Sequence, residues 1–149
     1  MRILVACDHG AFELKQQVVS YLQQRGHEVI DLGTNGTQSV DYPDFAGKLC
    51  RALLAGTGER GVLMCGTGIG ISIAANRFPG IRAALCHDEL TARLSRLHND
   101  ANVLVMGGRT TGPATADAIL AAWLKTPFEG GRHQRRLASL EQQHQKEPA

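Results

Sequence analysis

The sequence predicts an α/β protein in which a parallel sheet is covered by helices on both faces. Short apolar runs alternate along the whole chain with segments of helical period. The runs are mostly continuous, which is typical of strands buried on both faces. A chain of 149 residues suits one domain with its own core. We therefore expect residues 1–149 to form a single domain with five strands and about six helices.

Each expected element has its own signal in the sequence. The strands are the apolar runs at residues 3–6, 29–32, 62–64, 83–85 and 103–106. Between them, apolar side chains recur at helical spacing, as Leu14, Val18 and Leu22 do. Pro43 stands at the first position of the next expected helix, where its missing N–H is tolerated.

The C-terminal end differs from the rest of the chain. Gly130 and Gly131 break the chain before a last, polar helix over residues 132–145. Because that helix has little apolar surface, we expect it to project from the domain and to rest on a partner subunit. The last residues, 147–149, should fray.

Composition argues against several classes of protein. Charged residues make up 20% of the chain, and its net charge of +2 is too weak to favour nucleic acid. No apolar run reaches the roughly 18 residues of a membrane-spanning helix. The N-terminus lacks the layout of a signal peptide. We expect a protein that binds neither nucleic acid nor a membrane.

The cysteines indicate the compartment. No two of Cys7, Cys50, Cys65 and Cys86 have the two-residue spacing of a zinc or redox motif. Three of them end apolar runs, and free thiols in such places suit a reducing environment. The expected location is therefore the cytoplasm.

Candidate site residues follow the expected strands, because ligands bind beyond the carboxyl ends of strands in open parallel sheets. The first strand is followed by Asp8, His9 and Gly10, and the second by Gly33 and Thr34. The third is followed by Cys65, Gly66, Thr67, Gly68, Ile69 and Gly70, the fourth by His87 and Asp88, and the fifth by Gly107, Gly108 and Arg109.

The turn after the third strand is the most informative. Glycines at 66, 68 and 70 let the backbone approach a ligand closely. Their N–H groups, at the start of a helix, favour an anion. A thiol at the rim of such a site is favoured as the thiolate, so we interpret Cys65 as reactive. The alternative is a buried cysteine beside a merely tight turn.

Other phosphate motifs fit this turn poorly. A Walker loop needs a lysine, which Ile71 and Ser72 do not supply. A thiol phosphatase loop needs arginine six positions after Cys65, where Ile71 stands. The dinucleotide fingerprint lacks its third glycine, although Gly70 is close and Asp88 lies about twenty residues on. A dinucleotide-dependent oxidoreductase therefore stays open as an alternative.

Candidates outside the turn have competing structural explanations. Asp8 and His9 suit a sugar hydroxyl and a phosphate, but Asp8 also suits a helix cap. Arg132 and Arg136 share one helical face and suit phosphate oxygens, or form a solvated basic face. His98 precedes the fifth strand and so lies at the wrong edge of the sheet. Either it is structural or it serves a neighbouring subunit, in a site that spans two chains.

These segments together resemble the ribose-5-phosphate isomerase type B family, which includes allose-6-phosphate isomerase and the subunits of galactose-6-phosphate isomerase. The matching segments cover residues 7–10, 41–43, 65–76, 98–102, 107–109 and 132–136, in order along nearly the whole chain. The resemblance implies a three-layer α/β/α sandwich with a five-stranded parallel, Rossmann-like sheet. It also implies a homodimer or dimer of dimers with active sites at the interface, and no metal or cofactor.

The resemblance also implies roles for the candidates. One branch of the family uses a cysteine before the turn, and another has a glutamate where this chain has Ile71. Cys65 is then the base that moves a proton between C2 and C1 through a cis-enediolate. Asp8 and His98 open the furanose ring, and Thr67 assists the turn. Substrate contacts fall to His9, Tyr42, Gly66, Gly68, Ile69, Gly70, Asn99, Arg109, Arg132 and Arg136.

The expected activity is the interconversion of ribose 5-phosphate and ribulose 5-phosphate. A close alternative is a six-carbon substrate such as allose 6-phosphate, which needs one CHOH more of reach between the turn and the phosphate. A non-catalytic sugar-phosphate sensor is a third possibility. The thiol of Cys65 argues against a sensor, because simple binding needs no thiolate.

Overall fold

The computed structural model describes residues 1–146; residues 147–149, expected to fray, lie outside the described part. The strands are β1 (Arg2–Cys7), β2 (Glu28–Asp31), β3 (Arg60–Cys65), β4 (Ala83–Leu85) and β5 (Val103–Gly107). The helices are α1 (Phe12–Gln24), α2 (Tyr42–Leu54), α3 (Ile69–Ala75), α4 (Glu89–Asn99), α5 (Pro113–Lys125) and α6 (Arg132–Gln145). A short 3-10 turn, η1 (His9–Ala11), precedes α1.

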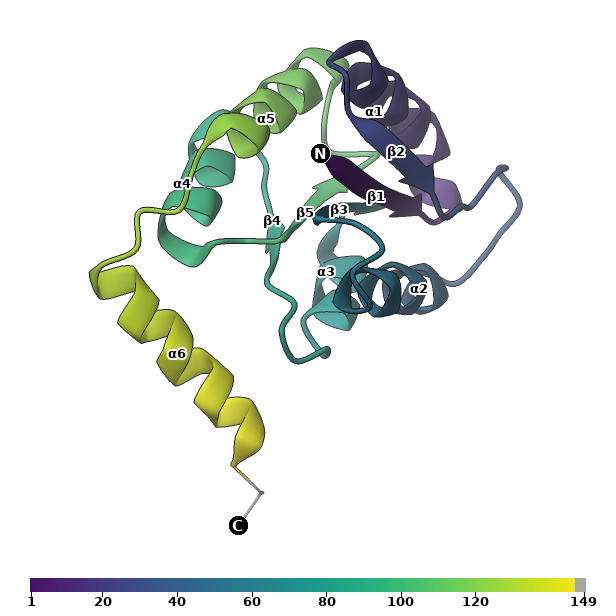
Figure 1. The fold of residues 1–149 in the computed structure, drawn as a ribbon. Helices are drawn as coiled ribbons and strands as arrows, with labels where there is room; N and C mark the ends of the chain where they lie inside the picture. The colour runs from purple at the N-terminus through teal and green to yellow at the C-terminus, as the bar shows by residue number, and fades with distance from the viewer. Residues whose placement is uncertain (147–149) are drawn as a thin grey trace.

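The five strands form one parallel sheet between two helical layers (Figure 1). One apolar core joins the sheet to α1, α4 and α5, and the other joins it to α2 and α3. Alternate residues of β1 belong to the two cores: Ile3 and Val5 to the first, Leu4 and Ala6 to the second. Burial on both faces explains the continuous apolar runs, and the predicted three-layer sandwich is confirmed.

The strand order, β2-β1-β3-β5-β4, contains a switch point between β1 and β3. The chain leaves β1 toward one edge of the sheet and leaves β3 toward the other. At such a point the two following loops diverge and leave a crevice at the carboxyl edge of the strands. The loops at this crevice begin at Asp8 and at Gly66, next to Cys65.

Helix α6 extends away from the sandwich, as the sequence predicted (Figure 1). Its first turns are held by His133 and Leu137, which are both buried. Farther along, Glu141 forms an ion pair of 3.3 Å with Arg82, the residue just before β4. Within residues 1–146, no helix has the length and apolar character needed to cross a bilayer.

Candidate active site

Three loops meet at the carboxyl edge of the sheet. A Cβ added to Gly10 would lie 3.0 Å from the Gly66 nitrogen, so the loops after β1 and β3 touch backbone to backbone. The loop after β5 closes the other side: Gly108 N–H donates to the Cys65 carbonyl, and Arg109 N–H to the Gly66 carbonyl, each at 2.8 Å. The turn after β3 is therefore supported on both sides.

Cys65 ends β3 with only 4% of its surface exposed. Its Sγ accepts a hydrogen bond of 3.2 Å from the Gly68 N–H, which points back because Gly68 has a φ of +78°. By contrast, Cys50 and Cys86 donate from their thiols to backbone carbonyls. The Cys65 sulfur thus faces a backbone donor of its own glycine turn, which the sulfurs of Cys50 and Cys86 do not.

The other cysteines are held as neutral thiols. Burial raises the pKa of Cys7 and of Cys50 to about 11 and also raises the pKa of Cys86. All four cysteines are free. Cys65 is set apart from these three by its place in the glycine turn, where its sulfur lies against the Gly68 N–H.

The rest of the turn is fixed by its own contacts. Thr67 is exposed, and its Oγ1 accepts from the Ile69 N–H at 3.2 Å. The N–H groups of Gly68 and Ile69 are thus already engaged within the turn. An anion bound here would meet the remaining N–H groups of the turn and the Thr67 hydroxyl.

Two side chains lie over the glycines of the turn. The Tyr42 ring lies against Gly70, where an added Cβ would be 2.6 Å from Tyr42 Cζ. The Arg109 guanidinium lies over Gly66, with Nη1 3.4 Å from an added Cβ. The absence of a side chain at Gly70 lets the Tyr42 ring approach the turn, whereas a Cβ at Gly66 would be in ordinary contact with Arg109.

Asp8 and His9 are both oriented by backbone groups. Asp8 is buried, and its Oδ1 accepts from the Gly10 N–H at 2.8 Å, so the capping role considered for it is present. His9 Nδ1 accepts from the Val40 N–H at 3.1 Å, which leaves Nε2 as the N–H donor. His9 also lines a hollow of about 150 Å³ with Gly10, Thr37 and Gly108.

The remaining candidates lie elsewhere. His98 and Asn99 end α4, and they precede β5 on the amino side of the sheet. Arg132 and Arg136 are exposed on α6, which packs on that end of α4. The five residues of β5 separate this group from Cys65 by about 16 Å along the strand. The structure therefore brings the candidates together as two groups rather than one.

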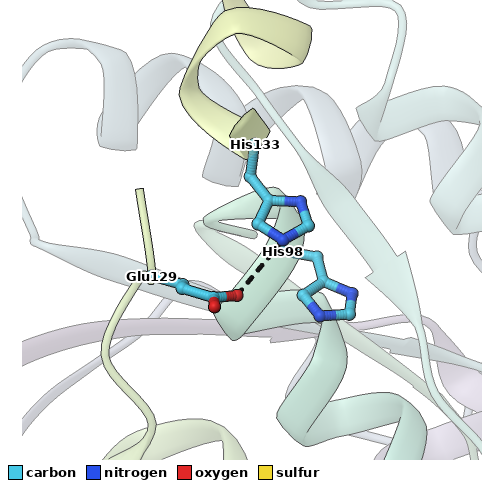
Figure 2. A group of neighbouring side chains, drawn as sticks. All are labelled: His98, Glu129 and His133. Carbon is cyan, nitrogen blue, oxygen red and sulfur yellow. Dashed lines mark ion pairs between the residues drawn. The ribbon is translucent and has the colours of Figure 1, made fainter. Parts of the chain in front are cut away.

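The α4–α6 junction holds two residues that had no predicted role, Glu129 and His133. The rings of His98 and His133 stack with centroids 4.3 Å apart and planes inclined by 14° (Figure 2). Glu129 Oε2 lies 3.2 Å from His133 Nε2. The only local signal is an acid four residues before a histidine at a helix start, which is too common to be specific.

Glu129, His98 and His133 could be considered as metal ligands, since one ligand atom of each lies within 4.8 Å of the others. The lone pairs of an imidazole lie in its ring plane. Because the two rings are nearly parallel, their lone pairs do not converge on one ion. The arrangement therefore favours ring stacking over metal binding.

Asp88, the acid considered for a dinucleotide ribose, has another role. It caps α4: its Oδ1 accepts from the Thr91 N–H at 2.7 Å, and this bond lowers the pKa of Asp88. It also follows β4, an edge strand two strands away from β3. This position is remote from the switch point, where a dinucleotide would bind.

Known proteins resemble this chain over nearly its whole length. A sequence profile described as Ribose/Galactose Isomerase matches residues 3–140. The chain is 48% identical to ribose-5-phosphate isomerase B of Escherichia coli over 93% of each chain. It is 44% identical to D-erythrulose-4-phosphate isomerase of Pectobacterium atrosepticum, over 88% of this chain and 87% of that relative.

A solved structure extends the likeness to three dimensions. The ribose-5-phosphate isomerase B of Clostridium thermocellum superimposes with a TM-score of 0.96 at 49% identity, covering 97% of this chain and 98% of that one. The sheet order, the glycine turn and the matches along nearly the whole length lead to one assignment. The chain belongs to the Ribose/Galactose Isomerase family.

Proposed function

We propose that the protein is an aldose–ketose isomerase that interconverts ribose 5-phosphate and ribulose 5-phosphate. The observation that carries the proposal is the Cys65 sulfur, placed at the switch point and facing the Gly68 amide. The choice of ribose 5-phosphate as substrate is supported by the relatives, since several are named ribose-5-phosphate isomerase B. The protein acts in the cytoplasm, which its four free thiols support.

The chemical step is a proton transfer between neighbouring carbons. The Cys65 thiolate removes the proton from C2 of the open-chain aldose, and the electron pair moves to form a cis-enediolate. The proton of the C2 hydroxyl passes to O1, and the thiol returns its proton to C1, which gives the ketose. Thr67 and the free amides of the turn stabilise the negative oxygen, and preorganised donors of this kind contribute about 3–4 kcal/mol each. General bases typically contribute about 10²–10⁴-fold in rate.

The substrate is held at its far end. The Nε2–H of His9 and the Arg109 guanidinium bind phosphate oxygens with Arg132 and Arg136. Tyr42 and Asn99 contact the sugar hydroxyls. Phosphate binding is remote from the reacting carbons, so its energy is available to orient C1 and C2 against Cys65.

Two subunits share each site in this proposal. His98 of one chain protonates the furanose ring oxygen while Asp8 of the other removes the anomeric hydroxyl proton, which opens the ring. The separation of the two groups within one chain supports this arrangement, because His98 cannot reach its own Cys65. The protein is accordingly a homodimer, or a dimer of dimers.

Surface features beside the turn support a second copy there. Ile69 and Ile73 stand one turn apart on α3 with 54% and 56% of their surfaces exposed. Exposed apolar pairs next to a site are typical of contact surfaces. The hollow beside His9, about 150 Å³, is also smaller than the roughly 300 Å³ at which ligand pockets usually begin. A second copy of the chain would complete the walls of this hollow.

The test is an isomerase assay on ribose 5-phosphate with the Cys65→Ser variant. We expect kcat to fall by about 10³-fold, since serine is a far weaker base than a thiolate. Cys86→Ser is the matched control: it replaces another buried thiol, one that donates to the Ala84 carbonyl as serine also can. Unchanged turnover in Cys65→Ser would exclude it as the base.

The same assay decides the substrate. Wild-type protein is compared on ribose 5-phosphate, allose 6-phosphate and a tetrose 4-phosphate, because one relative is named for erythrulose 4-phosphate. The highest kcat/KM is expected with ribose 5-phosphate. An absence of isomerisation with all three would overturn the proposal.

A further inference from the structure

The contact between α4 and α6 contains a buried imidazole that the chemistry so far leaves unused. His133 stands in the first turn of α6, is 5% exposed, and lies face to face with the ring of His98 (Figure 2). Its Nε2 is buried and has no aligned hydrogen-bond partner among residues 1–146. The nearest charge to that nitrogen is the Glu129 carboxylate, at 3.2 Å.

Glu129 is itself attached to the end of α4. Its backbone N–H donates to the Leu97 carbonyl at 3.0 Å, directly before His98 in the chain. The segment from Glu129 to His133 therefore wraps the turn that carries His98. The backbone bond thus holds Glu129 beside Leu97, the Glu129 carboxylate lies beside His133, and the His133 ring stacks on His98.

A purely structural role explains this arrangement poorly. A buried polar nitrogen without an aligned partner destabilises a fold, and an apolar side chain would fill the same space without that penalty. Stacking on another histidine adds a constraint that packing does not need. An imidazole oriented by a carboxylate is, however, a common way to hold a second group in a fixed position.

We propose that Glu129 and His133 are positioning residues for His98, and that they hold its ring in the orientation needed to open the sugar. The inference rests on the ring-opening role proposed for His98. It adds that Glu129 fixes the His133 ring and that the His133 ring limits the rotation of His98. The pair should therefore matter only for substrates that arrive as closed rings.

The two substrates differ in this respect. Ribose 5-phosphate closes through its C4 hydroxyl onto the C1 aldehyde. Ribulose 5-phosphate would need its C5 hydroxyl to close a five-membered ring onto C2, and that oxygen carries the phosphate. The ketose is therefore open-chain, and exchange of its C1 proton with solvent requires Cys65 but no ring opening.

The experiment compares these two reactions in His133→Leu, which removes the ring while retaining an apolar side chain. One assay follows turnover of ribose 5-phosphate, and the other follows deuterium uptake at C1 of ribulose 5-phosphate in D₂O by NMR. We expect kcat/KM for the aldose to fall roughly 10- to 100-fold, as for other residues that orient a reacting group. Deuterium uptake should change less than about threefold.

Further variants separate positioning from damage to the fold. Glu129→Gln alters a side chain that is 54% exposed, so it leaves packing intact, and it should reduce aldose turnover several-fold while sparing exchange. His133→Phe restores a stacking ring and should recover part of the loss. Glu141→Gln removes the other ion pair of α6, with Arg82, and should leave both rates close to wild type.

Several results would overturn the inference. Equal loss of both rates in His133→Leu and Glu129→Gln would indicate a general defect, and full aldose turnover in both would show that the pair does not act. His98→Ala is the reference: if it lowers both rates equally, the proposed ring-opening role itself fails. Combining His98→Ala with His133→Leu should add no further loss, because the second residue acts through the first.

Discussion

Gly70 shows how a single missing side chain shapes the site. The Tyr42 ring occupies the space into which a Cβ at this position would extend, 2.6 Å from Cζ. Contacts below 3.0 Å do not persist, so any larger residue must displace the ring or the turn. Position 70 therefore requires glycine because of Tyr42, at the start of α2.

We predict that Gly70→Ala raises KM for ribose 5-phosphate about tenfold, the effect of losing roughly one good contact of 1.4 kcal/mol. Steady-state kinetics will measure this. Gly36→Ala is the matched control, because an added Cβ there meets nothing within 4 Å. Wild-type KM in Gly70→Ala would show that the Tyr42 ring does not contact the substrate.

The buried thiols of Cys7 and Cys50 make stability depend on pH. Burial raises the pKa of each to about 11, from an ordinary value of 9.0. Below pH 9 both folded and unfolded chains carry neutral thiols. Between pH 9 and 11 only the unfolded chain releases these protons, so rising pH favours unfolding.

We therefore predict that the free energy of unfolding falls above pH 9, by about 2 kcal/mol per thiol at pH 11. Urea denaturation at fixed protein concentration, from pH 8 to 10.5, will measure it. The double variant Cys7→Ala, Cys50→Ala should show a shallower fall than wild type. If the free energy of unfolding falls equally with pH in wild type and in the double variant, Cys7 and Cys50 are not the cause of the fall.

At the scale of the elements, the end of α4 depends on one acid. Asp100 takes a left-handed conformation with a φ of 45°, which ends the helix directly after His98 and Asn99. Its carboxylate lies 2.8 Å from Arg96 Nη1 and 3.5 Å from Arg82 Nη2. The Arg96 side chain is buried, so its charge depends on this partner.

We predict that Asp100→Asn lowers the free energy of unfolding by about 1–2 kcal/mol, because asparagine keeps the left-handed conformation but leaves the Arg96 charge unpaired. Turnover of ribose 5-phosphate should fall several-fold as the His98 turn loosens. Urea denaturation and kinetics will test both. Asp117→Asn, which alters an acid bonded to Gln17 on α1, should change stability less.

Much of this architecture could be predicted from the sequence. Continuous apolar runs marked the strands because both faces of the sheet are buried, and the strand ends identified Cys65 and Asp8. The position of His98 before β5 was enough to place it at the far edge. The run at 62–64 was too short, since β3 begins at Arg60, a charged residue that local hydropathy does not recognise as a strand.

The contacts of the α4–α6 junction could not be predicted. The stacking of His98 on His133 joins residues far apart in the chain, and no periodicity encodes it. The same holds for the Val40 amide that orients His9. Such contacts depend on how complete elements pack, whereas strands and helices are specified locally.

For the whole molecule, the two groups of site residues predict complementation between subunits. In the proposed arrangement, Cys65→Ser and His98→Ala each disable a different half of every site. After random exchange of subunits, half of the dimers contain one chain of each variant. Each of these hybrid dimers has one intact site out of two. About a quarter of the wild-type activity should therefore return.

The return of activity is measured with ribose 5-phosphate in mixtures of the two variants that have been coexpressed or refolded together. A mixture of Cys65→Ser with Thr67→Ala is the control, since both changes fall in the same half and no intact site can form. Exchange of subunits is verified with differently tagged chains. A mixture that stays inactive after verified exchange would place the base and the acid in one chain.

The position of Cys65 and His98 at opposite edges of the sheet has a consequence for dilute protein. In the proposed mechanism an isolated chain cannot bring its own His98 to its own Cys65, because the sheet lies between them. We predict that, on dilution below the dissociation constant of the proposed dimer, the number of working sites falls with the square of the chain concentration. Specific activity then becomes proportional to how much protein is present, and the turnover measured per chain reports the strength of association as well as the chemistry.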